Sequence, residues 1–464
     1  MHFLKHQCML LIYVPKLTNR VGYTLNVVMR DILKTDFAIT TNAEVFDSHE
    51  ESRLCYAPQP LTIPTDRQEE LPYIYIKSTQ LLFETSIEEQ NLHCIEYEGR
   101  PALFPVFGRH TALPFDPFAS IFFMLSRYEE YLPHHRDEHG RFMVTESVAY
   151  QNGFLQSAMV DRWAMMLKEL ILKKYPDTVF GTRNYTFVQT VDIDAAYCYL
   201  HKGVFRTTLG ILRDGLHRHD WPEVKRRIQV LRKKETDPFD TFDYIIEKSH
   251  SLARHSSLLF FALVGDYGIY DKPASFQNND FRQLLQHLGD YAKVGVHGSY
   301  YSSEEPMRLG REIERLSDIM HRTIVRNRFH FLRFTLPSAY RNLVDNGIGH
   351  DYSMGYAEQA GFRCGTCTIV PFFDLNSNQE CDLKIHPFMA MDTTFHTHQG
   401  LTPEQATEQF KKLIDEVREL GGTFSCIFHN QNLCEDYGWE GWRQVYEEVL
   451  QYAGQKTTDT NRND

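Results

Sequence analysis

The feature that most constrains the fold of this chain is a series of six short apolar runs in its C-terminal part, each followed by a polar or ionisable residue. The runs alternate with amphipathic stretches of helical period, which predicts βα units and a parallel sheet. The carboxyl ends of parallel strands share one edge, so we expect the residues that follow the runs to share one site. The predicted strands and the residues that follow them are 185–191 with Asp192-Ile193-Asp194, 258–264 with Asp266, 293–296 with His297, 330–332 with Arg333, 387–391 with Asp392, and 423–428 with His429.

Two helices of this C-terminal part are well delimited in the sequence. Thr402 precedes Pro403 and is followed three residues later by Gln405, which predicts a helix that begins with a capping box and ends at Gly421-Gly422. A second helix is predicted from a single apolar stripe that runs from Leu309 to Ile324. Both helices are expected on the outside of a (β/α) barrel.

The N-terminal part has a different pattern. It begins with an apolar strand at 9–14, which lacks the small-residue cleavage site of a signal peptide, and continues with helical stretches near 21–33, 118–132 and 160–170 and several β-rich segments. Its polar segments near 127–130 and 137–141 fit the mouth of the barrel, a partner or solvated turns equally well. We predict a smaller α/β domain at 1–180, a barrel at 184–455 and a disordered tail at 456–464.

Charge and composition exclude several classes of function. Forty-nine Lys and Arg against 61 Asp and Glu give a net charge of −12, so no nucleic-acid partner is expected. No apolar run approaches the roughly 20 residues of a membrane span, and the mean hydropathy is −0.41. Nine scattered cysteines, an odd number, favour a reducing compartment and a cytoplasmic protein. Cys364 and Cys367 have no second such pair, which favours two semi-buried thiols over a zinc site.

The residues at the strand ends suit hydrolytic chemistry. Asp192 and Asp194 lie on one side of an extended strand, too close together for the two flanking carboxylates of a glycosidase, and suit a base beside a metal ligand. His297 is interpreted as a ligand or catalytic residue. Arg333 would keep a carboxylate ionised, and His429 would act as a general acid oriented by Asp392; each position also fits a residue that only opens a loop.

Five short motifs carry a resemblance to a known family. In chain order they are Thr190-Val191-Asp192-Ile193-Asp194, His297-Gly298-Ser299, Arg333 with Pro337, Asp392, and Phe428-His429. This order resembles the polysaccharide deacetylase superfamily (NodB homology, carbohydrate esterase family 4). Segments 115–123, 126–131, 331–334, 351–356 and 361–363 resemble more closely a bacterial subgroup with an extra N-terminal domain, so that the likeness spans nearly the whole chain.

The resemblance implies a distorted (β/α) barrel that hydrolyses C–N bonds in a polysaccharide or an acetylated amino sugar. It implies a divalent metal, expected to be zinc, held by Asp194 and His297. It further implies Asp192 as the base and Arg333 as its partner. The general acid would be His429, with Asp392 behind it. The sequence indicates no particular protein partner.

The second motif departs from the family pattern, because the position that usually holds a second histidine, four residues after His297, is Tyr301. Three outcomes stay open: Tyr301 or water completes the metal shell, a histidine such as His396, His398 or His201 does so, or no catalytic metal is bound. Three functions follow, namely a metal-dependent deacetylase, a degenerate barrel that binds carbohydrate or a partner protein, and a metal-independent acid–base enzyme.

Overall fold

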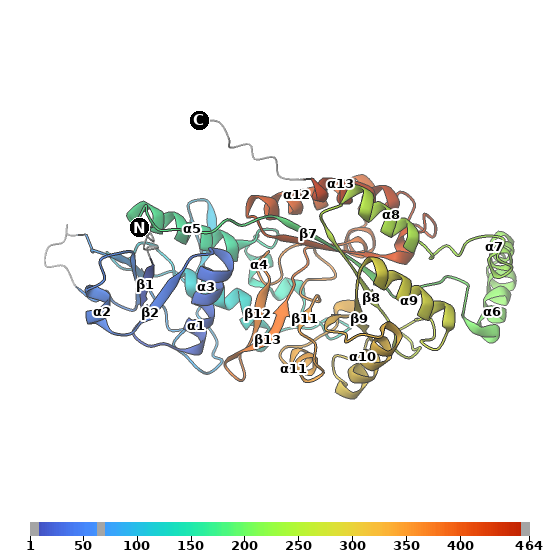
Figure 1. Ribbon diagram of the computed structural model, residues 1–464, viewed down its shortest axis with the longest axis horizontal. Coiled ribbons are helices and arrows are strands. Elements are labelled where there is room, and N and C mark those ends of the chain that lie inside the picture. Colours follow the sequence, from blue (N-terminus) through green and yellow to red (C-terminus); the bar gives the residue numbers. More distant parts are fainter. Residues whose placement is uncertain (1–8, 63–69, 456–464) are drawn as a thin grey trace, which may run out of the picture.

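The computed structural model describes residues 9–62 and 70–455 of the chain, which form a mixed α/β protein with one parallel sheet and one mainly parallel sheet (Figure 1). The predicted tail at 456–464 lies outside the described residues. In the part of the chain that the structure describes, no helix is both long and apolar enough to cross a membrane.

The first sheet lies in the N-terminal part, has the order β2-β1-β3-β4 and is parallel throughout. It confirms the strand predicted at 9–14. A separate hairpin follows it. The strands of the sheet are β1 (Leu10–Tyr13), β2 (Phe37–Thr40), β3 (Arg53–Ala57) and β4 (Ile74–Lys77), those of the hairpin β5 (Cys94–Tyr97) and β6 (Arg100–Leu103), and the helices of this part α1 (Asn19–Asn26), α2 (Ala43–Asp47), α3 (Pro117–Leu125), α4 (Val148–Gln151) and α5 (Met159–Lys174).

The second sheet has nine strands in the order β12-β13-β11-β10-β9-β8-β7-β15-β14, with every neighbouring pair parallel except β12 and β13. Among the described residues no pairing joins β12 to β14, so a closed barrel is not shown. The strands are β7 (Thr186–Ile193), β8 (Ser257–Ala262), β9 (Lys293–Gly298), β10 (Arg326–Phe329), β11 (His350–Asp351), β12 (Val370–Asp374), β13 (Gln379–Ile385), β14 (Ala390–Met391) and β15 (Thr423–His429).

Helices lie around the second sheet and contact it at β9, β13 and β15 (Figure 1). The capping box of α12 is present, because the Thr402 side chain accepts from the Gln405 N–H while the Gln405 side chain accepts from the Thr402 N–H. The other predicted helix, α10, ends at Met320 instead of 324, because His321 takes a left-handed conformation. The helices are α6 (Gly203–Leu212), α7 (Trp221–Leu231), α8 (Phe242–Leu252), α9 (Asn279–Tyr291), α10 (Pro306–Met320), α11 (Ser338–Asp345), α12 (Pro403–Glu419) and α13 (Trp442–Gly454).

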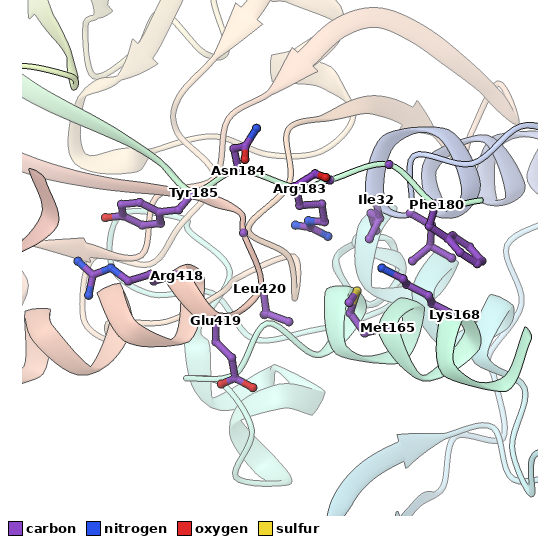
Figure 2. Close-up of a pocket in the computed structure, with 14 residues that line it drawn as sticks. Ile32, Met165, Lys168, Phe180, Arg183, Asn184, Tyr185, Arg418, Glu419 and Leu420 are labelled. Atoms are coloured by element: carbon purple, nitrogen blue, oxygen red, sulfur yellow. The ribbon is translucent and has the colours of Figure 1, made fainter. Parts of the chain in front are cut away.

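Buried polar contacts join the N-terminal and C-terminal parts. Asp161 on α5 accepts hydrogen bonds from Thr366 and Thr368 at 2.6 Å and from the Cys367 N–H at 3.0 Å. Glu130 accepts from the Arg363 guanidinium at 2.7 and 2.9 Å, and Cys364 and Cys367 are buried free thiols in this region. A cavity of about 530 Å³ lies between α5, the end of α12 and residues 180–185. Figure 2 shows the residues that line it. The division at 180–184 stays a prediction.

Candidate active site

The carboxyl edge of the second sheet gathers most of the residues predicted for the site. On β7, Asp192 pairs in register with His429 of β15, and Asp194 follows the end of the strand. Two strands away, His297 of β9 pairs in register with Arg328 of β10. Asp192, His297 and His429 are buried, which holds their side chains in fixed positions. Asp266 also follows a strand, but its exposed side chain pairs with Arg315 at 2.9 Å and does not join this group.

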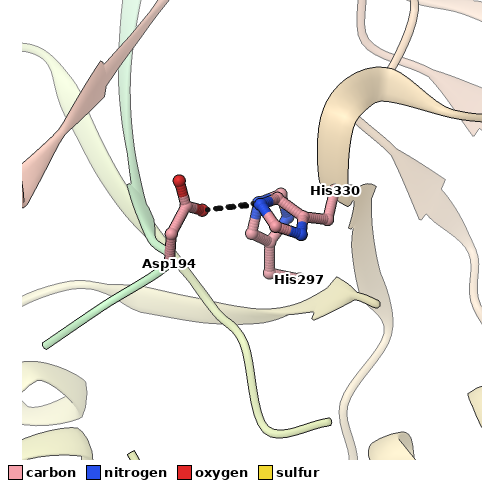
Figure 3. Close-up of side chains that lie close together, drawn as sticks. All are labelled: Asp194, His297 and His330. Atoms are coloured by element: carbon pink, nitrogen blue, oxygen red, sulfur yellow. Dashed lines mark ion pairs between the residues drawn. The ribbon is translucent and has the colours of Figure 1, made fainter. Parts of the chain in front are cut away.

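Asp194, His297 and His330 converge on one point (Figure 3). Asp194 Oδ1 lies 3.2 Å from His297 Nε2 and 3.5 Å from His330 Nε2. These three atoms are all within 4.8 Å of one another, close enough to bind one ion. His330 was not among the residues that the sequence predicted.

The partners of the two imidazoles prepare their Nε2 atoms as ligands. His297 Nδ1 donates to the Arg328 carbonyl at 2.9 Å, and His330 Nδ1 donates to Asp271 Oδ1 at 2.8 Å. In its neutral form, each ring has its Nε2 lone pair directed at Asp194, whose buried Oδ1 has no hydrogen-bond partner among the described residues. One carboxylate and two imidazoles oriented by hydrogen bonds fit a divalent ion such as zinc with a position left for water. The residues thus fit a candidate Asp/His/His metal site.

Electrostatic interactions in the site favour the charged forms of its groups. Burial would raise the pKa of Asp194, but His330 and His429 hold it well below its usual range. Burial would lower the pKa of His330, but Asp194 and Asp271 raise it to about 9. The pKa of His429 rises to about 10 because Asp392, Asp194 and Asp192 outweigh its burial. The carboxylates around these two imidazoles outweigh the effect of burial, and their negative charge would also stabilise a bound cation.

Asp192 has a different arginine partner from the predicted one. Arg328 is fully buried and donates through Nη1 to Asp192 Oδ1 at 2.8 Å and to Thr190 Oγ1 at 2.7 Å. The prediction that Arg333 pairs with Asp192 is wrong. Arg333 donates to Glu304 at 2.7 Å, because Phe331 and Leu332, both with positive φ, turn the chain away from the strand direction.

Tyr301 is not among the three residues that converge on the ion position. Its side chain is 39% exposed, and its ring lies against Tyr300 and under the Arg308 guanidinium. Of the three histidines considered as substitutes, His396 stacks on Trp439 and His201 contacts Asp280. His398 lines the site cavity but is not part of the candidate metal cluster in the described residues. A histidine from elsewhere does join the cluster, but it is His330.

His429 has the fixed partner that the sequence predicted. Its Nδ1 donates to Asp392 Oδ1 at 2.7 Å, and its backbone N–H donates to Asp392 Oδ2 at 2.8 Å. Asn432 donates to the same Oδ2 at 2.9 Å. His429 Nε2 then points toward Asp194, at 3.8 Å from Oδ2. A protonated imidazole held in this way can deliver a proton into the cavity.

A cavity of about 320 Å³ opens over these groups. Part of its wall is apolar, and Arg141 from the N-terminal part reaches it. Arg141 is held by Asp137 at 2.6 Å and donates to the Phe331 carbonyl at 2.9 Å, so the segment 137–141 lies at the mouth of the site. The other lining residues are Asp192, Asp194, His297, Phe329, His330, Phe331, Leu332, Ala357, Met391, Thr393, Thr397, His398 and His429.

A strand predicted at the wrong position explains why the sequence did not predict His330 and Arg328 as site residues. The strand predicted at 330–332 is instead β10 (Arg326–Phe329), which the search for apolar runs missed because Phe329 is the single apolar residue of the four. Residues two apart on a strand point to the same side, so Arg328 and His330 are directed together at the site. With the correct boundary, the rule that a polar residue follows each strand would have selected His330.

Comparison with known proteins gives a family model for the N-terminal part only. Residues 10–176 match a family of unknown function, DUF7033, which is less than half of the chain. No curated protein matches the chain.

Among solved structures, the chain is similar to a protein of Mycobacterium smegmatis provisionally named a polysaccharide deacetylase, with 13% identity, a TM-score of 0.37, and coverage of 58% of this chain and 85% of that one. The PuuE allantoinase has 11% identity and a TM-score of 0.37, with coverage of 58% and 83%. A Pseudomonas aeruginosa PAO1 protein, also provisionally named a polysaccharide deacetylase, has 15% identity and a TM-score of 0.36, with coverage of 58% and 84%. Likeness at these TM-scores does not decide the activity of this chain.

Proposed function

We propose that the protein is a metal-dependent hydrolase that removes acetyl groups from an amino sugar or a glycan, on a deacetylase-type barrel that follows a smaller N-terminal domain. The observation that carries the proposal is the convergence of Asp194 Oδ1 with the Nε2 atoms of His297 and His330. The acetylated sugar as substrate rests on the sequence motifs around Asp192, His297 and His429. The eight described cysteines are all free, which supports the expected cytoplasmic location.

Asp194, His297 and His330 would hold the metal, which when bound polarises the acetamide carbonyl and increases the acidity of water. Arg328 keeps Asp192 ionised through Oδ1, while Oδ2 lies toward the site, 3.7 Å from His297 Nε2. Asp192 thus accepts the proton of the attacking water.

His429, held by Asp392, donates a proton to the amide nitrogen as the C–N bond breaks. A new C–O bond forms, and acetate and a free amine leave. The amine is a poor leaving group unless it is protonated, so the general acid must reach the amide nitrogen. Asp392 occupies Nδ1 of His429, which leaves Nε2 to face the cavity. The apolar side chains of Leu332 and Met391 fit the acetyl methyl group on this reading.

Acetate release from a panel of acetamido sugars and chitooligosaccharides, with Zn²⁺, Co²⁺ or Mn²⁺ supplied, tests the proposal. We expect deacetylase activity that is lost on chelation and restored by added metal. Asp192→Asn and His429→Gln should each reduce this activity by at least about 100-fold. Arg333→Gln is the matched control, because Arg333 does not contact Asp192, and it should retain activity. Activity that survives exhaustive chelation would refute the metal-dependent mechanism. If no substrate of the panel releases acetate, the proposed deacetylase activity is wrong.

A further inference from the structure

A two-helix arm formed by residues 201–235 projects from the second sheet (Figure 1). It consists of α6, the π-helical turn η4 (Arg213–His217) and α7. Its chemistry takes no part in the proposed reaction, and the inference below does not depend on that reaction.

The outer face of this arm is apolar and uncovered. α6 has no buried residue, although half of its residues are Val, Phe, Leu or Ile. Phe205, Leu209, Leu212 and Leu216 are spaced at i, i+4, i+7 and i+11, which places them on one helix face, and all are exposed. Val204 and Trp221 are exposed beside them, at 86% and 61%. Single exposed apolar residues are ordinary, but a contiguous face of this size marks an interaction surface.

The same arm is strongly basic. Residues 201–235 carry ten Lys and Arg against four Asp and Glu, a net charge of +6 in a chain whose net charge is −12. Arg206 and Arg213 lie next to the apolar face on the helix, and the side chains of Arg213 and Arg218 are more than half exposed. The rest of the chain therefore carries −18, and positive charge is concentrated where the apolar face is.

The arm is built to keep this face outward. α6 packs on α7 at Gly210, where an added Cβ would lie 2.8 Å from the Arg227 guanidinium. Arg227 pairs with the buried Asp214 on this inner side. Arg206 stacks on Tyr267 of the body at 4.0 Å. The inner contacts thus combine the Arg227–Asp214 ion pair with the buried Val224 and Val230 of α7, while every side chain of α6 stays at least partly exposed.

We propose that this arm docks the protein on a membrane surface rich in anionic lipid. An apolar helix face bordered by Lys and Arg, with exposed Phe and Trp, matches the two parts of such a surface, the acyl boundary and the anionic headgroups. A second copy of the chain fits less well, because face-to-face packing of two arms would bring two charges of +6 together. The remaining charge of −18 is repelled by the same surface and orients the arm toward it.

Vesicle flotation at 0.1 M NaCl tests the proposal with the full chain, comparing equimolar phosphatidylcholine and phosphatidylglycerol vesicles with pure phosphatidylcholine vesicles. We expect binding to the anionic vesicles that is at least about tenfold stronger than to the neutral ones and that weakens at 0.5 M NaCl. Phe205→Glu should weaken it at least about tenfold, and Phe205→Ser should weaken it without adding charge. Both changes are at an exposed position, so the fold should persist.

Phe107→Glu is the matched control, because Phe107 is an exposed phenylalanine of the N-terminal part, at 87% against 77% for Phe205. It should bind as the wild type does. Equal binding to both vesicle types, equal loss in the Phe107 and Phe205 variants, or no binding to either vesicle type would overturn the proposal. So would sedimentation of the unbound protein as a dimer that Phe205→Glu dissociates, since that result assigns the face to a second copy.

Discussion

Replacing Asp271 by Asn tests whether His330 completes the metal site. Asp271 Oδ1 accepts from His330 Nδ1 at 2.8 Å and from the Tyr300 N–H at 3.0 Å. An Asn oxygen can accept both bonds, so the change removes mainly the negative charge behind the ligand. Loss of such an outer partner typically costs about 10 to 100-fold in metal affinity, or about 1.4 to 2.7 kcal/mol. We therefore expect Asp271→Asn to weaken Zn²⁺ binding within this range.

Direct removal of the ligand should have a larger effect. His330→Ala should weaken binding by more than Asp271→Asn, and Tyr301→Phe should leave it unchanged because Tyr301 is not in the cluster. Asp266→Asn is the matched control, since Asp266 lies in the same loop with a side chain 64% exposed and pairs with Arg315.

Competition with a chromogenic chelator, together with metal content by plasma mass spectrometry on untagged protein, gives each affinity. Unchanged Zn²⁺ affinity in His330→Ala, or a loss in Tyr301→Phe as large as in His330→Ala, would refute the assignment of His330.

Two further predictions concern the contribution of buried carboxyl groups to stability. Arg363 and Arg127 lower the pKa of Glu130 to about 2, against the effect of burial. The charged Glu130 should therefore contribute about 3 kcal/mol to the free energy of unfolding at pH 7. Glu130→Gln should lose this contribution, which urea titration measures. Glu419→Gln, at a side chain 65% exposed, should change that free energy by less than about 1 kcal/mol; a similar loss in both variants would contradict the burial argument. Burial raises the pKa of Glu312 from 4.5 to about 7, so its neutral form is favoured in the fold, and stability present below pH 4.5 is lost as the pH rises through 7. Glu312→Gln should therefore gain about 2 to 3 kcal/mol relative to the wild type between pH 5 and pH 8, and no relative gain would rule this out.

Much of the fold follows from local patterns, and the structure agrees with those predictions. The capping box at Thr402 and the strand at 9–14 depend on residues close in the sequence, and both are present. Asp192, Asp194, His297 and His429 are gathered at one edge because parallel strands share a carboxyl end, a rule that needs only the strand positions. Sheet closure and the partners of each side chain depend on how distant strands pair, which no local pattern contains.

The net charge of the whole chain also concealed a local feature. A net charge of −12 argued against a nucleic-acid partner, yet residues 201–235 carry +6. The charge count of that segment is readable from the sequence, but its uncovered apolar face is not, since the stripe of Phe205, Leu209 and Leu212 is what a buried helix also shows. Only the packing of α6 decides that these side chains face outward.

The sequence by itself determined most residue types of the candidate site and the edge of the sheet on which they lie, because period and strand ends are local properties of the chain. Only the tertiary structure decided which residues complete that site. Arg328 lies on the polar strand β10 and His330 directly follows it, and they acquire their roles because β10 pairs in register with β9, which places both side chains opposite Asp192 and Asp194. A ligand set is a relation between atoms on different strands, and such relations are fixed by strand pairing and burial, which arise only when the whole chain folds.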